Sequence, residues 1–259
     1  MHQLKALAFA AVLSTAVILA PAAAQNPPAN RMPVLVELFT SEGCSSCPPA
    51  DALLAKLDHN QPIANAEIIV LGEHVDYWDE LGWHDRFSSR QYTDRQTFYC
   101  SHFGVNGPFT PQMIVDGSDQ FVGNDEPHAL MAIKRAALSA KLPLKLSQPS
   151  VDGRKVSASV SIPAPTTAKP QTGIYAALVD PTDTTDVRGG ENGGHKLQHV
   201  GVVRTLEHIG TVKDLNAGPV SFHLTAPPDA KPATMRVVVF AQQSGQGTVL
   251  GADSISVTP

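Results

Sequence analysis

The sequence predicts an α/β domain with a mixed central sheet flanked by helices, followed by an all-β, sandwich-like domain. Two observations predict this order. The first part runs from an apolar segment of period-two character through a helical pattern to a second apolar segment, which implies parallel strands joined by a right-handed crossover. From Leu144 onward, short segments of alternating apolar and polar residues are separated by Pro- and Gly-rich turns, a texture typical of a β-sandwich.

The composition excludes one class of partner. The formal net charge is −5, and no basic stripe is present that would neutralise the phosphates of a nucleic acid. We therefore expect no nucleic-acid partner.

The N-terminal segment predicts export. Residues 1–24 have a weakly basic head, an apolar run from Ala6 to Ala20 and small residues up to Ala24, the pattern of a cleaved secretory signal peptide. The alternative is an uncleaved membrane anchor, but the run is short for a span and lacks a strongly charged stop. No later stretch is apolar enough to cross a bilayer. We expect a secreted or periplasmic protein in an oxidising compartment, with residues 25–32 as a flexible lead.

The predicted α/β domain covers residues 33–143. Its opening strand from Val34 leads to a Cys-Ser-Ser-Cys motif at Cys44 and Cys47, and a helix follows with its apolar positions on one face. The helix ends near residues 58–60, and residues 66–72 read as a buried strand. Thiols at the start of a helix meet free N–H groups and the helix dipole, which favour a thiolate.

The helix has two possible starts. If it begins at Cys44, Pro48 falls near the end of the first turn, where its missing N–H matters. If it begins near Cys47, with Ser45 or Ser46 as the cap, Pro48 and Pro49 fit, but Cys44 lies outside the first turn and its pKa falls less.

An insertion is predicted at about residues 74–107. It carries Trp78, Trp83 and a polar helical stretch over residues 87–99. Insertions of this length are usually lids or binding surfaces, and the alternative is an extra helix packed on the domain edge.

The predicted domain closes with a hairpin and a helix. Asp116-Gly117 is a hairpin turn signal, residues 120–123 form the return strand, and a helix runs over residues 128–140. The all-β domain, residues 144–259, is then predicted to contain strands at 156–162, 174–179, 201–206, 220–224, 235–240 and 248–257.

The cysteine spacing favours redox chemistry. Haem attachment would place a His directly after the second Cys, where Pro48 stands, and structural zinc would need a second Cys pair, where only Cys100 remains. The strand-to-helix setting and the predicted export both favour thiol–disulfide exchange. Cys100 is predicted either to trap Cys44 as a third thiol or, as the simpler interpretation, to be a buried apolar side chain.

These motifs resemble the thioredoxin-like superfamily. Cys44-Ser-Ser-Cys47 matches its redox motif, and residues 103–117, with Thr110-Pro111, match its cis-proline loop and hairpin. The chain also resembles the secreted bacterial family catalogued as domain of unknown function 1223. That second resemblance implies a thioredoxin-like fold but does not indicate which activity the protein has. It rests on the following residues: Val34, Glu37, Phe39, Thr40, His74, Asp76, Trp78 and Thr110 to Met113.

The resemblance implies roles for five residues. Cys44 would be the attacking thiol, exposed at the loop, and Cys47 the buried resolving thiol. Pro111 would be cis and face the disulfide, with the Thr110 backbone free to pair with an extended substrate peptide. Glu37 would be the buried acid that takes the proton of Cys47, or else would point to solvent.

The predicted function is therefore an exported thiol–disulfide oxidoreductase that acts on protein thiols or disulfides and needs no cofactor beyond its own redox-active disulfide. One alternative is copper or zinc binding and delivery through Cys44, Cys47 and His74. The other is a non-catalytic binding protein with a structural Cys44–Cys47 disulfide. In that case the loop from Arg188 to His195 would be a recognition tip or a flexible hairpin.

Overall fold

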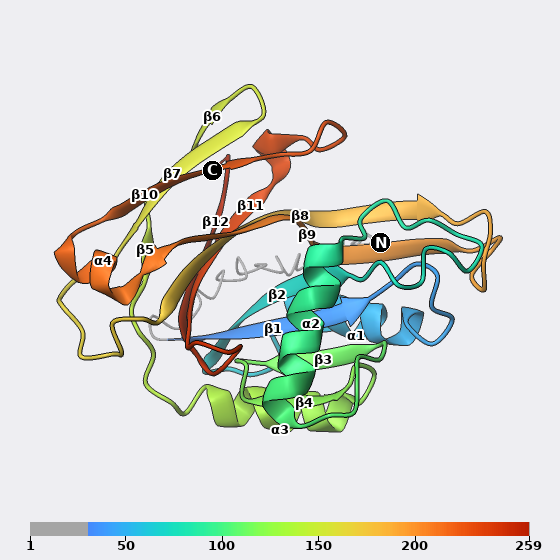
Figure 1. Ribbon diagram of the computed structural model, residues 1–259, viewed down its shortest axis with the longest axis horizontal. Coiled ribbons are helices and arrows are strands. Elements are labelled where there is room, and N and C mark those ends of the chain that lie inside the picture. The colour runs from blue at the N-terminus through green and yellow to red at the C-terminus, as the bar shows by residue number, and fades with distance from the viewer. Residues whose placement is uncertain (1–30, 259) are drawn as a thin grey trace, which may run out of the picture.

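The computed structural model describes residues 31–258 (Figure 1), so the predicted signal peptide at 1–24 and most of the lead at 25–32 lie outside it. Four α-helices and one 3₁₀-helix accompany the strands: α1 (Pro48–Asn60), α2 (Arg90–Phe103), α3 (Glu126–Ala136), α4 (Val212–Ala217) and η1 (Pro232–Thr234). The strands are β1 (Met32–Thr40), β2 (Ala66–His74), β3 (Gln112–Val115), β4 (Asp119–Val122), β5 (Lys145–Leu146), β6 (Ser150–Asp152), β7 (Lys155–Ser161), β8 (Gly173–Asp186), β9 (Lys196–Thr211), β10 (Val220–Thr225), β11 (Arg236–Gln242) and β12 (Val249–Ser256).

One mixed eight-stranded sheet organises the molecule, in the order β12-β11-β8-β9-β2-β1-β3-β4. β1 and β2 are parallel, and β3 and β4 form an antiparallel hairpin beside β1. The predicted mixed α/β architecture with a central sheet is confirmed at this level.

Alternation along β1 assigns the helices to the two faces of the sheet. Val34, Val36 and Leu38 pack with the buried side chains of α1 and α3. Leu35 faces the other way and shares a core with Tyr92 of α2. Neighbouring residues of β1 therefore point to opposite faces of the sheet, one toward α1 and the next toward α2.

The strands after residue 143 do not form a sandwich apart from the first part. β8, β9, β11 and β12 extend the main sheet, whereas β5, β7 and β10 form a second sheet to which β6 pairs. Apolar residues of β7, β8, β10 and β11 share one core, so the two sheets pack together as a sandwich would. The separate β-sandwich domain is thus not confirmed, although each predicted strand is present.

Two glycines permit the junction between the two parts of the main sheet. β2 and β9 pair in parallel at Gly72 and Val202. A Cβ on Gly201, whose φ is +62°, would lie 2.8 Å from the Val70 carbonyl oxygen, and one on Gly72 would lie 3.1 Å from the Val200 carbonyl oxygen. Only glycine allows the two backbones to approach this closely.

Within residues 31–258, no helix has both the length and the apolar character needed to span a membrane.

Candidate functional site

The Cys44–Cys47 disulfide lies where β1 leads into α1. α1 begins at Pro48 with Cys47 as its N-cap residue, so the two prolines occupy the first helical positions, where a backbone donor is not needed. The later of the two predicted helix starts is therefore correct. Cys44 lies outside the first turn, and its carbonyl accepts a hydrogen bond of 3.1 Å from the Cys47 N–H.

The Thr110–Pro111 peptide bond is cis, as expected. Ser46 connects this loop to the disulfide: its Oγ lies 3.4 Å from Cys44 Sγ and 3.5 Å from the Thr110 carbonyl oxygen. The Thr110 hydroxyl accepts a hydrogen bond of 2.8 Å from Trp78 Nε1. The structure thus brings together four of the predicted site elements: both cysteines, the cis-proline loop and the tryptophan of the insertion.

The expected exposure of Cys44 is wrong, because Cys44 and Cys47 are both 0% exposed. A segment from the other end of the chain covers them: residues 187–195 between β8 and β9, here called the cover loop. Asn192 Nδ2 donates to the carbonyls of Glu42 (2.9 Å) and Cys44 (3.0 Å), and Glu191 accepts from the Ser45 N–H at 3.0 Å. Ser45 itself remains exposed.

The insertion meets the cover loop above the disulfide. A Cβ on Gly189 would lie 2.4 Å from the Gly82 carbonyl oxygen, and one on Gly190 would lie 3.1 Å from Trp83 Cβ. Trp83 Nε1 also donates to Glu42 Oε2 at 2.7 Å. The insertion therefore contacts the cover loop, the segment predicted to be a recognition tip or a flexible hairpin, next to the loop that carries the cysteines.

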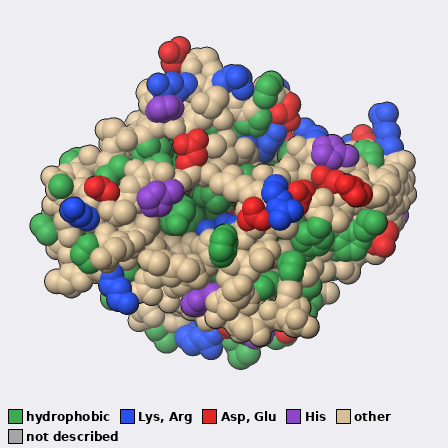
Figure 2. Space-filling model, in the orientation of Figure 1, with side chains coloured by type: hydrophobic (Ala, Val, Ile, Leu, Met, Phe, Trp, Pro, Cys, Tyr) green, Lys and Arg blue, Asp and Glu red, His purple; other side chains and the backbone are tan. Residues whose placement is uncertain are grey.

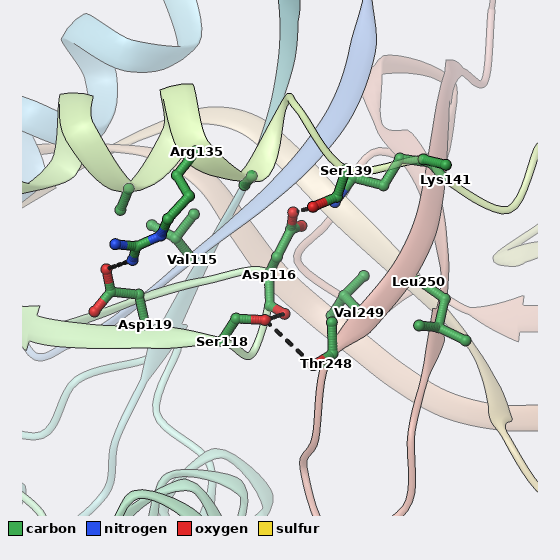
Figure 3. A pocket seen from close by; sticks show the side chains of 13 residues that line it. Val115, Asp116, Ser118, Asp119, Arg135, Ser139, Lys141, Thr248, Val249 and Leu250 are labelled. Atoms are coloured by element: carbon green, nitrogen blue, oxygen red, sulfur yellow. Dashed lines mark hydrogen bonds and ion pairs between the residues drawn. The ribbon is translucent and has the colours of Figure 1, made fainter.

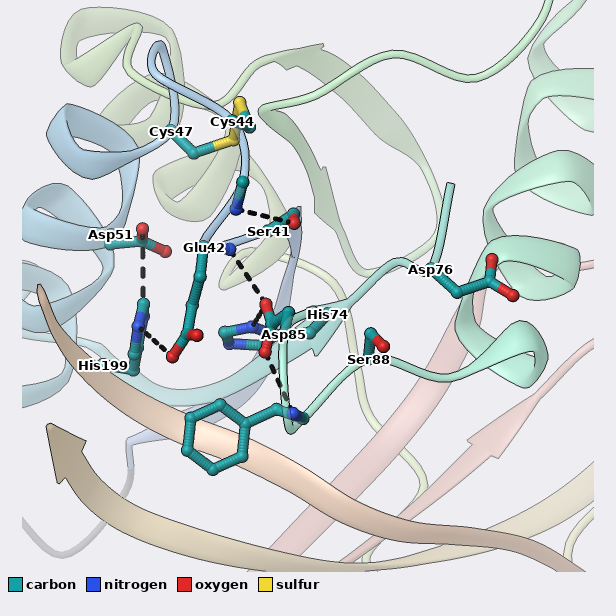
Figure 4. A network of polar contacts seen from close by, with 12 residues as sticks. Ser41, Glu42, Cys44, Cys47, Asp51, His74, Asp76, Asp85, Ser88 and His199 are labelled. Atoms are coloured by element: carbon teal, nitrogen blue, oxygen red, sulfur yellow. Dashed lines mark hydrogen bonds and ion pairs between the residues drawn. A yellow bond between two sulfur atoms is a disulfide. The ribbon is translucent and has the colours of Figure 1, made fainter. Parts of the chain in front are cut away.

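A buried group of ionisable side chains, here called the acid–histidine cluster, lies beneath the disulfide and consists of Glu42, Asp51 and His199 (Figure 4). His199 Nε2 is 3.5 Å from Glu42 Oε1, and His199 Nδ1 is 3.9 Å from Asp51 Oδ2. Burial alone would lower the His199 pKa, but the two carboxylates outweigh it and raise that pKa to about 10. His199 is therefore an imidazolium at neutral pH.

A second buried pair adjoins this cluster. His74 Nδ1 contacts Asp85 Oδ2 at 2.6 Å, and the rings of His74 and His199 are 4.8 Å apart. Burial would raise the Asp85 pKa, but His74 and two backbone N–H donors overcome it and lower that pKa to about 2. In the described part of the chain, no three His, Cys, Asp or Glu residues are arranged to hold a metal ion. Among the described residues, Cys44, Cys47 and His74 are not grouped as the ligands of a metal ion.

Glu37 is buried, as the resemblance implied, but it serves a different structure. Because side chains alternate along β1, Glu37 faces α2 rather than α1 and Cys47. Its carboxylate accepts hydrogen bonds from Arg95 Nε at 2.7 Å and from the Tyr99 hydroxyl at 2.5 Å. Glu37 was predicted to accept the proton of Cys47, but in the structure it points away from Cys47 and binds Arg95 and Tyr99 instead.

Cys100 is a buried free thiol on α2, near the Gln112 side chain at 3.9 Å. Burial raises its pKa. This matches the simpler of the two interpretations offered for it.

A cavity of about 330 Å³ lies between the β3–β4 hairpin, α3 and β12 (Figure 3). Its charged side chains are paired with one another, Asp116 with Lys141 and Asp119 with Arg135. Asp116 also accepts from the Leu35 N–H, near the start of β1, whereas the disulfide follows the end of that strand. This cavity is therefore separate from the disulfide site.

Sequence reasoning missed the functional positions that come from distant segments. Asn192 and His199 lie about 150 residues after the motif, and no pattern in the sequence around them indicates a contact with the cysteines. Glu42 and Asp51 flank the cysteines, so their proximity in sequence was an available signal.

The comparisons with known proteins concern almost the whole described chain. Residues 35–242 match the model of a family described as "Protein of unknown function (DUF1223)". A crystal structure of a protein from Agrobacterium tumefaciens is similar over 88% of this chain and 96% of that chain, with 28% identity and a TM-score of 0.65. The structure of HBP35 of Porphyromonas gingivalis is similar in fold over 88% of this chain and 76% of that chain, with 15% identity and a TM-score of 0.52. No curated protein matches the chain.

Proposed function

The chain belongs to the DUF1223 family, whose description assigns no activity, and we propose from the geometry of the site that it is an exported, thioredoxin-like thiol–disulfide oxidoreductase. The observation that carries the proposal is the Cys44–Cys47 disulfide at the start of α1, with the cis Thr110–Pro111 loop beside it. A purely structural disulfide needs neither a cis-proline loop beside it nor buried ionisable groups beneath it.

The proposed reaction has two balanced steps. In the reduced protein, the Cys44 thiolate attacks one sulfur of a protein disulfide, forms a mixed disulfide and releases a substrate thiolate. The Cys47 thiolate then attacks Cys44 Sγ and releases the second substrate thiolate. The chain loses two electrons as its disulfide forms, and the substrate gains two electrons as its disulfide is reduced to two thiols.

The cover loop adds a requirement to this reaction. Because both sulfurs belong to fully buried residues, a partner reaches Cys44 only after Asn192 has released the Glu42 and Cys44 carbonyls. The glycines at 189, 190, 193 and 194 give the loop the backbone freedom for such a movement. The proposed enzyme is therefore closed in its oxidised state and opens for its partner.

A trapping experiment tests the proposal. Reduced Cys47→Ser protein is incubated with disulfide-bonded insulin or with an extended peptide that contains a disulfide. A mixed disulfide through Cys44 is expected on non-reducing gels and in mass spectra. Cys44→Ser should trap nothing, and Cys100→Ser, as the matched thiol control, should reduce insulin like the natural sequence. Absence of both trapping and turnover would refute the oxidoreductase.

The complete burial of the disulfide favours one second candidate, a binding protein in which the Cys44–Cys47 bond is structural. In that case Cys44→Ala should lower the free energy of unfolding, and dithiothreitol should reduce the bond only on the timescale of global unfolding. Reduction that is faster than unfolding supports the enzyme instead, because it requires local opening alone.

A further inference from the structure

The acid–histidine cluster under the disulfide is not used by the two exchange steps. All three side chains are at least nine-tenths buried. Their exposed fractions are 0% for Glu42, 6% for Asp51 and 2% for His199. Glu42 Oε1, Asp51 Oδ2 and both ring nitrogens of His199 lack a hydrogen-bond partner in the described part of the chain. Such groups are costly to bury, so their presence at this position calls for a function.

The cluster is connected to both cysteines. Asp51 lies in the first turn of α1, and its backbone N–H donates to the carbonyl of Cys47 at 3.1 Å. Glu42 precedes Cys44 by two residues, and Asn192 binds the carbonyls of both. Figure 4 shows the Asp51 and Glu42 side chains extending toward the His199 ring from the segments that carry the two cysteines. Both carboxylates therefore belong to the segments that carry the sulfur atoms, whereas His199 belongs to β9.

The charge of the cluster has a definite sign. Two carboxylates and one imidazolium leave one net negative charge, and the neighbouring Asp85 carboxylate is paired with His74 and is not counted with them. Negative charge in a buried region disfavours the formation of another anion nearby. Only the reduced protein can form thiolates at Cys44 and Cys47, so the penalty falls on the reduced state.

We propose that Glu42 and Asp51, with His199 as their partial counter-charge, bias the Cys44–Cys47 couple toward its disulfide form and make the reduced protein a donor of electrons to partner disulfides. This inference rests on the proposed oxidoreductase and deepens it by naming the groups that set the direction of exchange. Reduced glutathione, two molecules per disulfide, supplies the electron pair in the test and forms one molecule of oxidised glutathione.

The test is a redox titration of the full chain in buffers of reduced and oxidised glutathione, with the dithiol fraction measured after acid quenching and alkylation. Asp51→Asn removes negative charge and should shift the equilibrium about tenfold toward the dithiol, the change that one thiol pKa unit produces. His199→Gln removes positive charge and should shift it about tenfold toward the disulfide. Thiolate absorbance at 240 nm should report a lower thiol pKa in the first variant and a higher one in the second.

Two further variants keep the test decisive. Glu42→Gln should shift the equilibrium in the same direction as Asp51→Asn. It takes the place of Asp51→Asn in the test if Asp51→Asn does not fold. The matched control is Asp116→Asn. Asp116 is a buried acid that accepts a hydrogen bond from the Leu35 N–H near the start of β1, and its replacement should leave the equilibrium unchanged. Shifts of the same sign in Asp51→Asn and His199→Gln, or no shift in either, overturn the inference while leaving the oxidoreductase intact. A natural pair that never equilibrates with glutathione overturns the oxidoreductase itself.

Discussion

At the residue scale, the buried polar group around Arg95 is the clearest case of a charge held by its surroundings. Arg95 is 4% exposed and contacts Glu37, Glu73, Tyr99 and Gln242. Burial raises the Glu73 pKa well above its usual range, against the opposing charge of Arg95. Arg95 therefore neutralises the Glu37 carboxylate in the middle of the sheet, where no solvent reaches.

Replacement of Arg95 should be strongly destabilising. Arg95→Met leaves the Glu37 carboxylate buried without its counter-charge, and we expect the free energy of unfolding to fall by about 3–5 kcal/mol. Tyr99→Phe removes one hydrogen bond to the same carboxylate and should cost about 1.5–3 kcal/mol. Urea unfolding followed by circular dichroism measures both, and an equal cost for the two variants would contradict an ionic Glu37.

His199 should make the stability of the protein depend on alkaline pH. Its folded pKa of about 10 lies above the ordinary value of 6.5. The stabilisation from its protonated form is complete below about pH 6.5 and is lost as the pH rises through 10. The difference in free energy of unfolding between the natural sequence and His199→Gln should therefore shrink between pH 6.5 and 10.5 in urea titrations. His195→Gln, an exposed histidine in the cover loop, should show no such trend.

At the element scale, the cover loop decides access to the sulfur atoms. Residues 187–195 join two long antiparallel strands, β8 and β9, whose pairing fixes the loop over the start of α1. The loop is held there by the two Asn192 hydrogen bonds and by the Glu191 contact with the Ser45 N–H. The closed state thus depends on these polar contacts and on the close packing of Gly189 and Gly190 against Gly82 and Trp83.

Loss of the Asn192 amide should open the site. Asn192→Ala removes two hydrogen bonds worth about 0.5–1.5 kcal/mol each, so we expect reduction of the disulfide by dithiothreitol to accelerate by about 5- to 160-fold. Asn216→Ala, which removes an amide contact with Thr166 elsewhere, should leave the rate unchanged. An unchanged rate in Asn192→Ala would show that the loop does not limit access.

Local patterns predicted most elements, and the reasons for the misses are physical. The α1 end, the Asp116-Gly117 turn and the C-terminal strands follow from periodicity and turn chemistry, which act over a few residues. The face of Glu37 depends on the phase of β1, and a shift of one residue reverses it. The pairing of β2 with β9 joins Gly72 to Val202, and no local signal encodes such a contact.

At the scale of the whole molecule, that β2–β9 junction connects the two parts of the main sheet. Gly201→Ala would place a methyl group 2.8 Å from the Val70 carbonyl oxygen at a φ of +62°. Backbone strain and overpacking together should lower the free energy of unfolding by about 2–5 kcal/mol. Gly104→Ala has a φ of +67° with nothing within 4 Å of the new Cβ, so it isolates the strain, about 1–2 kcal/mol. Equal costs in urea unfolding would show that close packing at the junction is unimportant.

The same junction explains why the site belongs to neither half of the chain. A fragment that stops at Pro143 would keep both sulfurs and the proline opposite them, yet it would lack Asn192 and His199. It would also present β2 as an unpaired edge where β9 normally runs. Such a fragment would be expected to self-associate and to leave its disulfide open to thiols in solution, because the segment that covers the sulfur atoms comes from the part of the chain after Pro143.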